Sequence, residues 1–229
     1  MRLFGSRPFS RCSVLVTVLL ACMIALQAWS QATHPVAYTG LNSSPFLKPN
    51  PQDSTGHLPY VYYAPDGDLT GYRAAIFEPV TVYQGADAQL GGLTPEHVQE
   101  LATYMQTQFQ QALSARFYPA TAMGPSVLRV RITLTGASRS VPVLSTAGQV
   151  VPVGAVLGVI RGSRDKARKT LGSVSYAVEV YDSSTHRLLR AFVVYEYPKP
   201  EDVRASVGPL GSSEASVRRG ASLLVSQLQ

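Results

Sequence analysis

The sequence predicts an α+β domain in two layers: a mainly antiparallel sheet of about four to five strands, one long helix packed on it at residues 94–117, and a C-terminal helix. Three observations predict this fold. Apolar residues recur at three- and four-residue steps after Thr94, residues 126–135 alternate with a two-residue period, and two alternating segments flank a polar turn at 182–186. A helix laid across a sheet buries the apolar faces of both elements.

Residues 33–70 precede the single α+β domain, which is expected at 71–229, and read as an extended lead-in. Proline removes a backbone donor and fixes φ, so neither a helix nor a central strand is expected in this stretch. Three tyrosines at 60, 62 and 63 indicate that part of the lead-in docks on the domain. The punctuating residues are Pro35, Pro45, Pro49, Pro51, Pro59 and Pro65, with Gly40, Gly56 and Gly67 between them.

The first strand of the domain is expected at residues 72–83, which are rich in β-branched and aromatic side chains. Pro79 lies inside it and indicates an edge strand or a bulge. A glycine-bearing loop at 85–93 leads to the long helix. Thr94 is the expected N-cap and Pro95 suits the first helical position, while Pro119 stops the helix after residue 117.

Three more strands are expected at residues 126–135, 173–182 and 188–197, the last two joined by the turn at 182–186. The strand at 126–135 should have one face in the core and one face in water. A weaker hairpin is expected at 141–153. The C-terminal helix spans 212–228, with Val217, Ala221, Leu224, Val225 and Leu228 on one face, although Gly220 weakens it.

Residues 1–32 have the three parts of an export signal. Three arginines at 2, 7 and 11 form a basic head, residues 12–26 form an uncharged apolar run, and small residues at 28–32 follow. Cleavage is expected after Ser30 or Ala32. The fifteen-residue run is short of the roughly 20 residues of a membrane-spanning helix; extended to Trp29 it reaches eighteen, which makes an uncleaved anchor the weaker alternative.

Lipidation is an equally supported alternative to simple cleavage. The tetrad at residues 19–22 resembles a bacterial lipobox and makes Cys22 the lipidation candidate, although the apolar run continues to Leu26. Cys12 and Cys22 are the two cysteines, so a chain beginning at Thr33 has no thiol for a disulfide, a nucleophile or a metal site.

Charge changes sign along the chain after the signal. Residues 33–111 hold two basic and seven acidic residues, whereas residues 112–229 hold fifteen basic and seven acidic ones. Five basic residues follow the glycine-rich apolar stretch 150–160, and they are possible contacts for an anionic membrane surface or lipopolysaccharide. A solvated charged loop is the simpler interpretation. Nucleic acid is not an expected partner of an exported protein. The five residues are Arg161, Arg164, Lys166, Arg168 and Lys169.

Motifs for catalysis, metal binding and cofactor binding are missing from the sequence. There is no G-x-S-x-G elbow, no H-E-x-x-H pair and no phosphate-binding Gly-Lys-Ser/Thr. The carboxylate pairs Asp66–Asp68 and Glu201–Asp202 occur among turn-forming residues, and His97 and His186 are expected at the surface. We therefore expect no cofactor, no metal and no enzymatic activity.

Several segments together resemble the bacterial domain-of-unknown-function family 3313. Residues 63–83 carry a Tyr–Pro lead-in and the step Glu78-Pro79-Val80, and residues 178–196 match the family's closing hairpin. The order of export signal, helix near residue 100 and arginine-bearing strand near residue 130 also agrees. The resemblance covers about residues 40–200, with Glu78 where aspartate is expected. It implies an exported lipoprotein without an assigned activity.

The sequence thus predicts an exported protein of the cell envelope, located in the periplasm or attached to a membrane through lipid on Cys22. We expect a non-catalytic adaptor or accessory protein that acts on another envelope protein. Two alternatives are a hydrolase of envelope polymers without a recognisable motif and a domain that contacts anionic lipid. A concave pocket with converging polar groups would favour the hydrolase.

Overall fold

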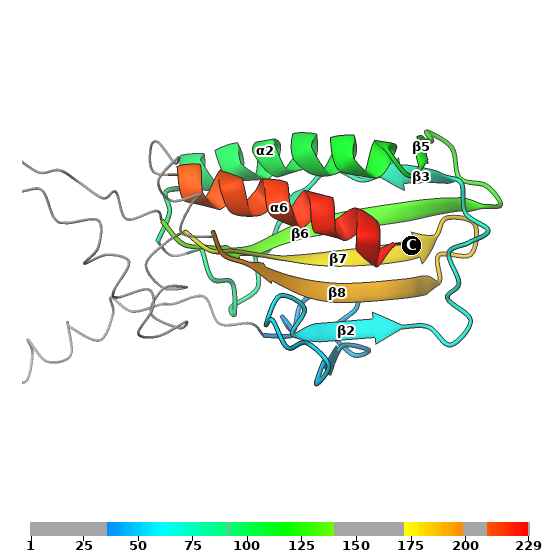
Figure 1. The fold of residues 1–229 in the computed structure, drawn as a ribbon, viewed down its shortest axis with the longest axis horizontal. Helices are drawn as coiled ribbons and strands as arrows, with labels where there is room; N and C mark the ends of the chain where they lie inside the picture. The colour runs from blue at the N-terminus through cyan, green and yellow to red at the C-terminus, as the bar shows by residue number, and fades with distance from the viewer. Residues whose placement is uncertain (1–35, 91, 140–171, 199–209, 229) are drawn as a thin grey trace, which may run out of the picture. The chain divides into compact units, whose positions relative to one another are not determined.

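The computed structural model describes residues 36–90, 92–139, 172–198 and 210–228. These residues form one mixed sheet of eight strands, two helices and the loops between them (Figure 1). All of them belong to one unit, Ala32–Gln229. The strand order is β1-β2-β8-β7-β6-β3-β5, and β4 also pairs with β6. The strands are β1 (Lys48–Pro49), β2 (Tyr60–Tyr63), β3 (Ala74–Phe77), β4 (Thr81–Val82), β5 (Tyr118–Pro119), β6 (Val127–Ala137), β7 (Val174–Asp182) and β8 (Leu188–Glu196).

The α+β class is confirmed, but the sheet is mixed and has eight strands, whereas four to five mainly antiparallel strands were expected. The long strands β6, β7 and β8 are antiparallel as predicted, whereas β3 and β4 pair parallel with β6, and β5 pairs parallel with β3. Strands β1, β2 and β5 have only two to four residues each and are too short to show an alternation in sequence, which explains why they were missed.

The strand expected at 72–83 is two strands, β3 and β4, separated at Pro79. Both pair with β6 on the same side, and the amide of Glu78 donates to the carbonyl of Val130 at 3.0 Å. After Pro79 the chain leaves the ladder, because the amide of Val80 donates to the side chain of Gln106 in the long helix at 2.6 Å. Proline cannot donate to a ladder, so the break falls at this residue.

Two helices, α2 (Pro95–Ser114) and α6 (Gly211–Gln227), lie side by side on one face of the sheet (Figure 1). Thr94 caps α2 as predicted, since its hydroxyl accepts from the amide of His97 at 3.4 Å. Helix α2 ends earlier than the expected residue 117, because Tyr118 pairs with β3. The buried side chains of α2 are Leu101, Ala102, Met105, Phe109 and Leu113, and those of α6 include Val217, Ala221 and Leu224.

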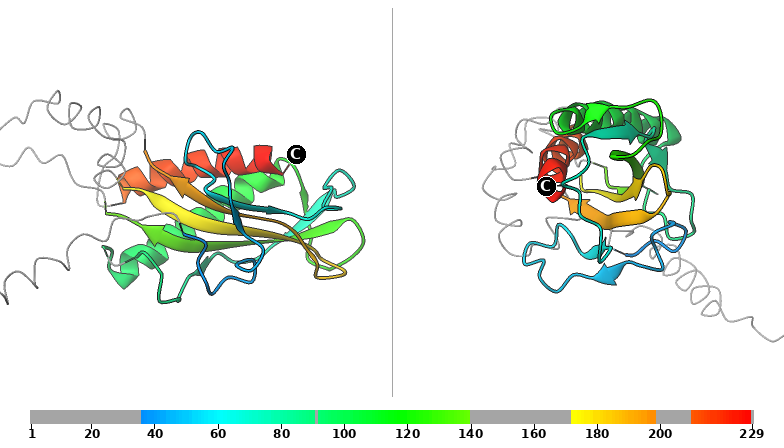
Figure 2. Two further views of the ribbon diagram at one scale, coloured as in Figure 1. Left: turned by 90° about the horizontal axis from the view of Figure 1, so that it is seen from below. Right: turned by 90° about the vertical axis from the view of Figure 1, so that its right-hand side faces the viewer.

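The opposite face of the sheet is covered by residues 36–47 (Figure 2). Tyr38 is only 1% exposed, and its hydroxyl lies 2.9 Å from that of Ser175 on β7. The amide of Ser43 donates to the buried carboxylate of Glu179 at 2.7 Å. The prediction of one wet face on β6 is wrong for its C-terminal half, where Thr133 and Thr135 are buried.

The segment expected to be a lead-in also supplies β1 and β2, and β2 lies inside the sheet between β1 and β8. The expected export signal at 1–32 and the expected hairpin at 141–153 lie outside the described residues. Within the described ranges, neither helix has the length and apolar character needed to cross a bilayer.

Candidate functional site

A cavity of about 200 Å³ lies where β7, β8 and α6 meet the loop before β2. Its wall is mainly apolar, and one end carries the side chains of His57 and Glu196. An apolar cavity of about 150 Å³ in another protein holds a benzene molecule, so this one has room for a small organic group. The apolar wall consists of Leu58, Tyr176, Phe192, Val194, Leu223 and Leu224.

Strand β8 brings Glu196 into the cavity. Side chains two residues apart on a strand point to the same face, so Glu196 follows Phe192 and Val194 toward the helices. Glu196 is 0% exposed, and neither of its carboxylate oxygens accepts a hydrogen bond from a described residue. Burying a carboxylate without hydrogen bonds is energetically costly, so such a group calls for an explanation.

The pairing of β2 with β8 brings His57 to the same place. In this antiparallel ladder Tyr60 lies opposite Val193. Residue 57 is three positions before Tyr60 and residue 196 is three positions after Val193, so these two residues also lie opposite each other. The ladder continues beyond the strand ends, because the amide of Tyr195 donates to the carbonyl of His57 at 2.9 Å.

The imidazole of His57 is held by three neighbours. Its Nδ1 lies 3.0 Å from the carbonyl oxygen of Tyr195 and 3.3 Å from a carboxylate oxygen of Glu196, and its ring stacks on Tyr197 at 4.8 Å. Both neighbours of Nδ1 are acceptors, so we assign a proton to Nδ1 and a hydrogen bond to Tyr195. The carboxylate of Glu196 raises the pKa of His57, and burial opposes this effect.

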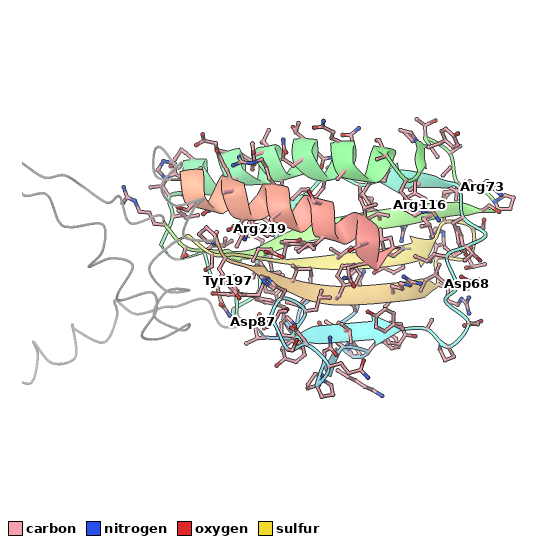
Figure 3. The ribbon with its side chains drawn as sticks, viewed as in Figure 1. Asp68, Arg73, Asp87, Arg116, Tyr197 and Arg219 are labelled. Carbon is pink, nitrogen blue, oxygen red and sulfur yellow. The ribbon has the colours of Figure 1, made fainter. Side chains whose placement is uncertain are left out.

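Among the described residues, Arg219 of α6 is a second cation that pairs with Glu196. Its guanidinium lies 3.9 Å from the carboxylate of Glu196 and donates to the carbonyl of Tyr197 at 2.7 Å (Figure 3). Burial raises the pKa of Tyr176 well above its ordinary value, and the charge of Glu196 adds to the shift. The Tyr176 hydroxyl is therefore a neutral group at physiological pH.

The arrangement resembles part of a nucleophilic catalytic site and can also hold a ligand. A carboxylate beside the Nδ1 of an imidazole is two-thirds of a nucleophilic triad, and the third group would be a hydroxyl or thiol. Thr55 lines the cavity with a hydroxyl, but that hydroxyl donates to the carboxylate of Asp53 at 2.7 Å. A buried carboxylate at the end of an apolar cavity can instead receive hydrogen bonds from a ligand.

The residues singled out in the sequence do not form this site. Cys22 and the five basic residues from Arg161 to Lys169 lie outside the part of the chain that the structure describes. Asp66 pairs with Arg187, and Asp68 accepts from Thr70, so these two carboxylates bind separate partners in an exposed loop. Across the described ranges, no three His, Cys, Asp or Glu residues gather as metal ligands.

His57 and Glu196 were both missed by the sequence reasoning. A signal for Glu196 exists, because it occupies a core-facing position of the alternation in β8, where a carboxylate is unusual. The position of His57 depends on how β2 pairs with β8, and the local sequence does not reveal that pairing.

Comparison with known families and structures gives one family. The model of a family described as "Protein of unknown function (DUF3313)" matches residues 37–224. No curated protein matched the chain.

Solved structures with a similar chain trace are distant. A PelC dodecamer from Paraburkholderia phytofirmans is 10% identical, with 71% of this chain and 96% of that chain covered and a TM-score of 0.36. A DUF330 protein from Xanthomonas campestris is 12% identical, with 71% and 86% covered and a TM-score of 0.35. A PDZ domain protein from Parabacteroides distasonis is 10% identical, with 73% and 34% covered and a TM-score of 0.36. Similarities at this level support no functional argument.

Proposed function

The chain belongs to the DUF3313 family of proteins of unknown function, and on that premise we propose that it is an exported, non-catalytic adaptor or accessory protein of the envelope of a Gram-negative-type bacterium. It acts on another envelope protein, either in the periplasm or attached to a membrane through lipid on Cys22. Nucleic acid is not a partner in that compartment.

The observation that supports this proposal is the small number of residues between the expected lipidation site and the folded domain. Tyr38 is already buried against β7, only sixteen residues after Cys22. A fully extended chain covers at most about 3.3–3.6 Å per residue, so lipid on Cys22 would hold Tyr38 within about 55 Å of the membrane. Such a tether suits a protein that works on a partner close to the membrane.

The cavity beside Glu196 supports a non-catalytic role, because its wall is mainly apolar and the hydroxyl of Thr55 is directed to Asp53. The pair of His57 and Glu196 is the one observation that favours the hydrolase alternative. The two functions are separated by incubating the purified protein and a His57→Gln variant with cell-wall polymers. Turnover by the wild type that the variant lacks would establish the hydrolase and overturn the non-catalytic proposal.

Export is tested by expressing the full chain in a Gram-negative host, fractionating the cells and measuring the mass of the N-terminal peptide. We expect either a diacylglyceryl adduct on Cys22 in the membrane fraction or a free N-terminus after Ser30 or Ala32 in the periplasm. A Cys22→Ala variant should leave the membrane only in the first case. Recovery of the chain from the cytosol with residues 1–32 intact would overturn the proposal.

The adaptor role is tested by cross-linking in intact cells followed by mass spectrometry, which should identify a recurring envelope protein. Contact of the five basic residues, Arg161 to Lys169, with anionic lipid is compatible with this role. Their joint neutralisation should reduce co-sedimentation with anionic vesicles at low salt but not at high salt, because salt screens surface charge. Unchanged co-sedimentation would exclude the lipid contact.

A further inference from the structure

We propose that the cavity beside Glu196 is a binding site for a small primary amine with an apolar body. The ammonium group of the ligand would pair with the carboxylate of Glu196, and the apolar body would occupy the space between β8 and α6. The site lies within the described part of the domain, so the proposal is independent of export and of any envelope partner.

The carboxylate of Glu196 selects the head group of the ligand. It is fully buried, neither oxygen accepts a hydrogen bond of normal geometry from a described residue, and its ion-pair partners His57 and Arg219 lie 3.3 Å and 3.9 Å away. The two nearby donors are engaged elsewhere: His57 donates to the carbonyl of Tyr195, and Arg219 donates to the carbonyl of Tyr197. An ammonium carries three donors and no acceptor, so it can donate to a carboxylate oxygen once a shift of the neighbouring side chains uncovers that oxygen, whereas a hydroxyl can donate only one hydrogen bond.

The remaining wall selects the body of the ligand. The side chains of Phe192, Val194 and Leu224 offer no charged group, so this part of the cavity favours carbon. Its volume of about 200 Å³ fits a body slightly larger than a benzene ring, such as a phenyl group with a two-carbon arm. Leu223 lines the cavity and is 40% exposed, which places an entrance beside α6.

His57 makes the binding of an amine depend on pH. Three groups act on its imidazole, the carboxylates of Glu196 and Asp53 and the ring of Tyr197, and the guanidinium of Arg219 lies 3.9 Å from the same carboxylate of Glu196. A protonated imidazole 3.3 Å from Glu196 competes with the ammonium for the same carboxylate. Amine affinity should therefore rise as the pH passes upward through the raised pKa of His57.

The experiment compares three ligands with matched bodies: 2-phenylethylamine, 2-phenylethanol and 3-phenylpropanoate. Each is titrated by calorimetry into the protein as purified from expressing cells, at pH 6 and pH 8.5. We expect the amine to bind most tightly, the alcohol more weakly and the carboxylate not measurably, because Glu196 repels an anion. Equal affinity for the amine and the carboxylate, or no binding by any of the three, would overturn the proposal.

Two variants locate the binding. Glu196→Gln preserves the shape of the side chain. It should weaken the affinity for the amine at least about tenfold, which is about 1.4 kcal/mol, and leave the affinity for the alcohol nearly unchanged. Val194→Phe should remove binding of both, since it fills the cavity, and thermal unfolding checks that this variant is folded. If Glu196→Gln binds the amine as well as the wild type does, the ammonium does not sit at Glu196 and the assignment fails.

Discussion

Gly220 lets helix α6 approach β7 closely, and replacing it with alanine tests that packing. A Cβ at position 220 would overlap the hydroxyl oxygen of Tyr176, lie 3.2 Å from its Cζ and lie 3.3 Å from Cγ of Glu196. Tyr176 is 1% exposed and meets Phe109 edge-on at 5.0 Å, so its ring has little room to move. The buried ring of Tyr176 therefore leaves no room for a side chain at position 220 of α6.

Two opposing effects set the magnitude. Alanine is favoured over glycine inside a helix by about 1 kcal/mol. Overpacking a well-filled core costs about 1–3 kcal/mol. The difference predicts that Gly220→Ala lowers the free energy of unfolding by about 1 kcal/mol, although the same change in an exposed helix would raise it.

A double-mutant cycle isolates the contact. Tyr176→Phe removes the hydroxyl oxygen, so the nearest atom of this ring is Cζ at 3.2 Å from the new Cβ, and Gly220→Ala in that background should be neutral or stabilising. We expect a coupling energy of at least about 1 kcal/mol between the two positions, as for residues in direct contact. Urea unfolding followed by circular dichroism measures all four proteins.

Ser222 is the matched control on the exposed side of α6. Its hydroxyl bonds only the carbonyl of Arg218 in the same helix, at 3.1 Å, so Ser222→Ala should change stability by no more than about 0.5 kcal/mol. If Gly220→Ala stabilises the wild-type protein by the full helix preference, α6 does not approach Tyr176 this closely and the reasoning is refuted.

Three further changes have distinct signatures. Thr94→Ala removes the N-cap of α2 and should cost about 0.5–1 kcal/mol in urea unfolding, whereas Thr94→Ser should be nearly neutral. The folded-state pKa of His57 is raised from 6.5, so its stabilising contribution is full below pH 6.5 and disappears as the pH rises through the folded value. His57→Gln should therefore destabilise most near pH 5.5, and a pH-independent loss in thermal unfolding would contradict the link to Glu196. Tyr72 donates to Asp182 at 2.6 Å, and burial together with this carboxylate raises the pKa of Tyr72 to about 12. The same bond lowers the pKa of Asp182, so Tyr72→Phe should raise that pKa in an NMR titration and cost about 1 kcal/mol at pH 7 but less below pH 3.

The long elements of the fold could be predicted because each repeats its pattern several times. Strands β6, β7 and β8 each have nine or more residues, and α2 has 20, so alternation and helical spacing are both evident. Strands β3, β4 and β5 have two to four residues each, and their parallel partners are chosen by the path of the whole chain. The local sequence of these strands does not indicate which strand each of them pairs with.

The prolines of residues 33–70 predict neither a helix nor a central strand. Pro49 fits this rule, because it lies in the two-residue edge strand β1, but Tyr60–Tyr63 contain no proline and form β2 inside the sheet. Docking on the sheet then overrides local preference, as at Tyr38, where a bulky residue has a φ of 50° and is still buried. Contacts distant in sequence therefore decide the fold of this segment.

The same docking creates the candidate site. The register that pairs Tyr60 with Val193 also sets His57 opposite Glu196, so the cavity forms only when β2 is aligned on β8 in this way. A slip of one residue would turn the side chains of β2 to the other face and move His57 away from the carboxylate. Glu196 would then lose the imidazole that partly balances its buried charge, at a cost that disfavours the slipped pairing. The buried ion pair thus helps to specify the register in which β2 pairs with β8, and the same register places a carboxylate beside the cavity.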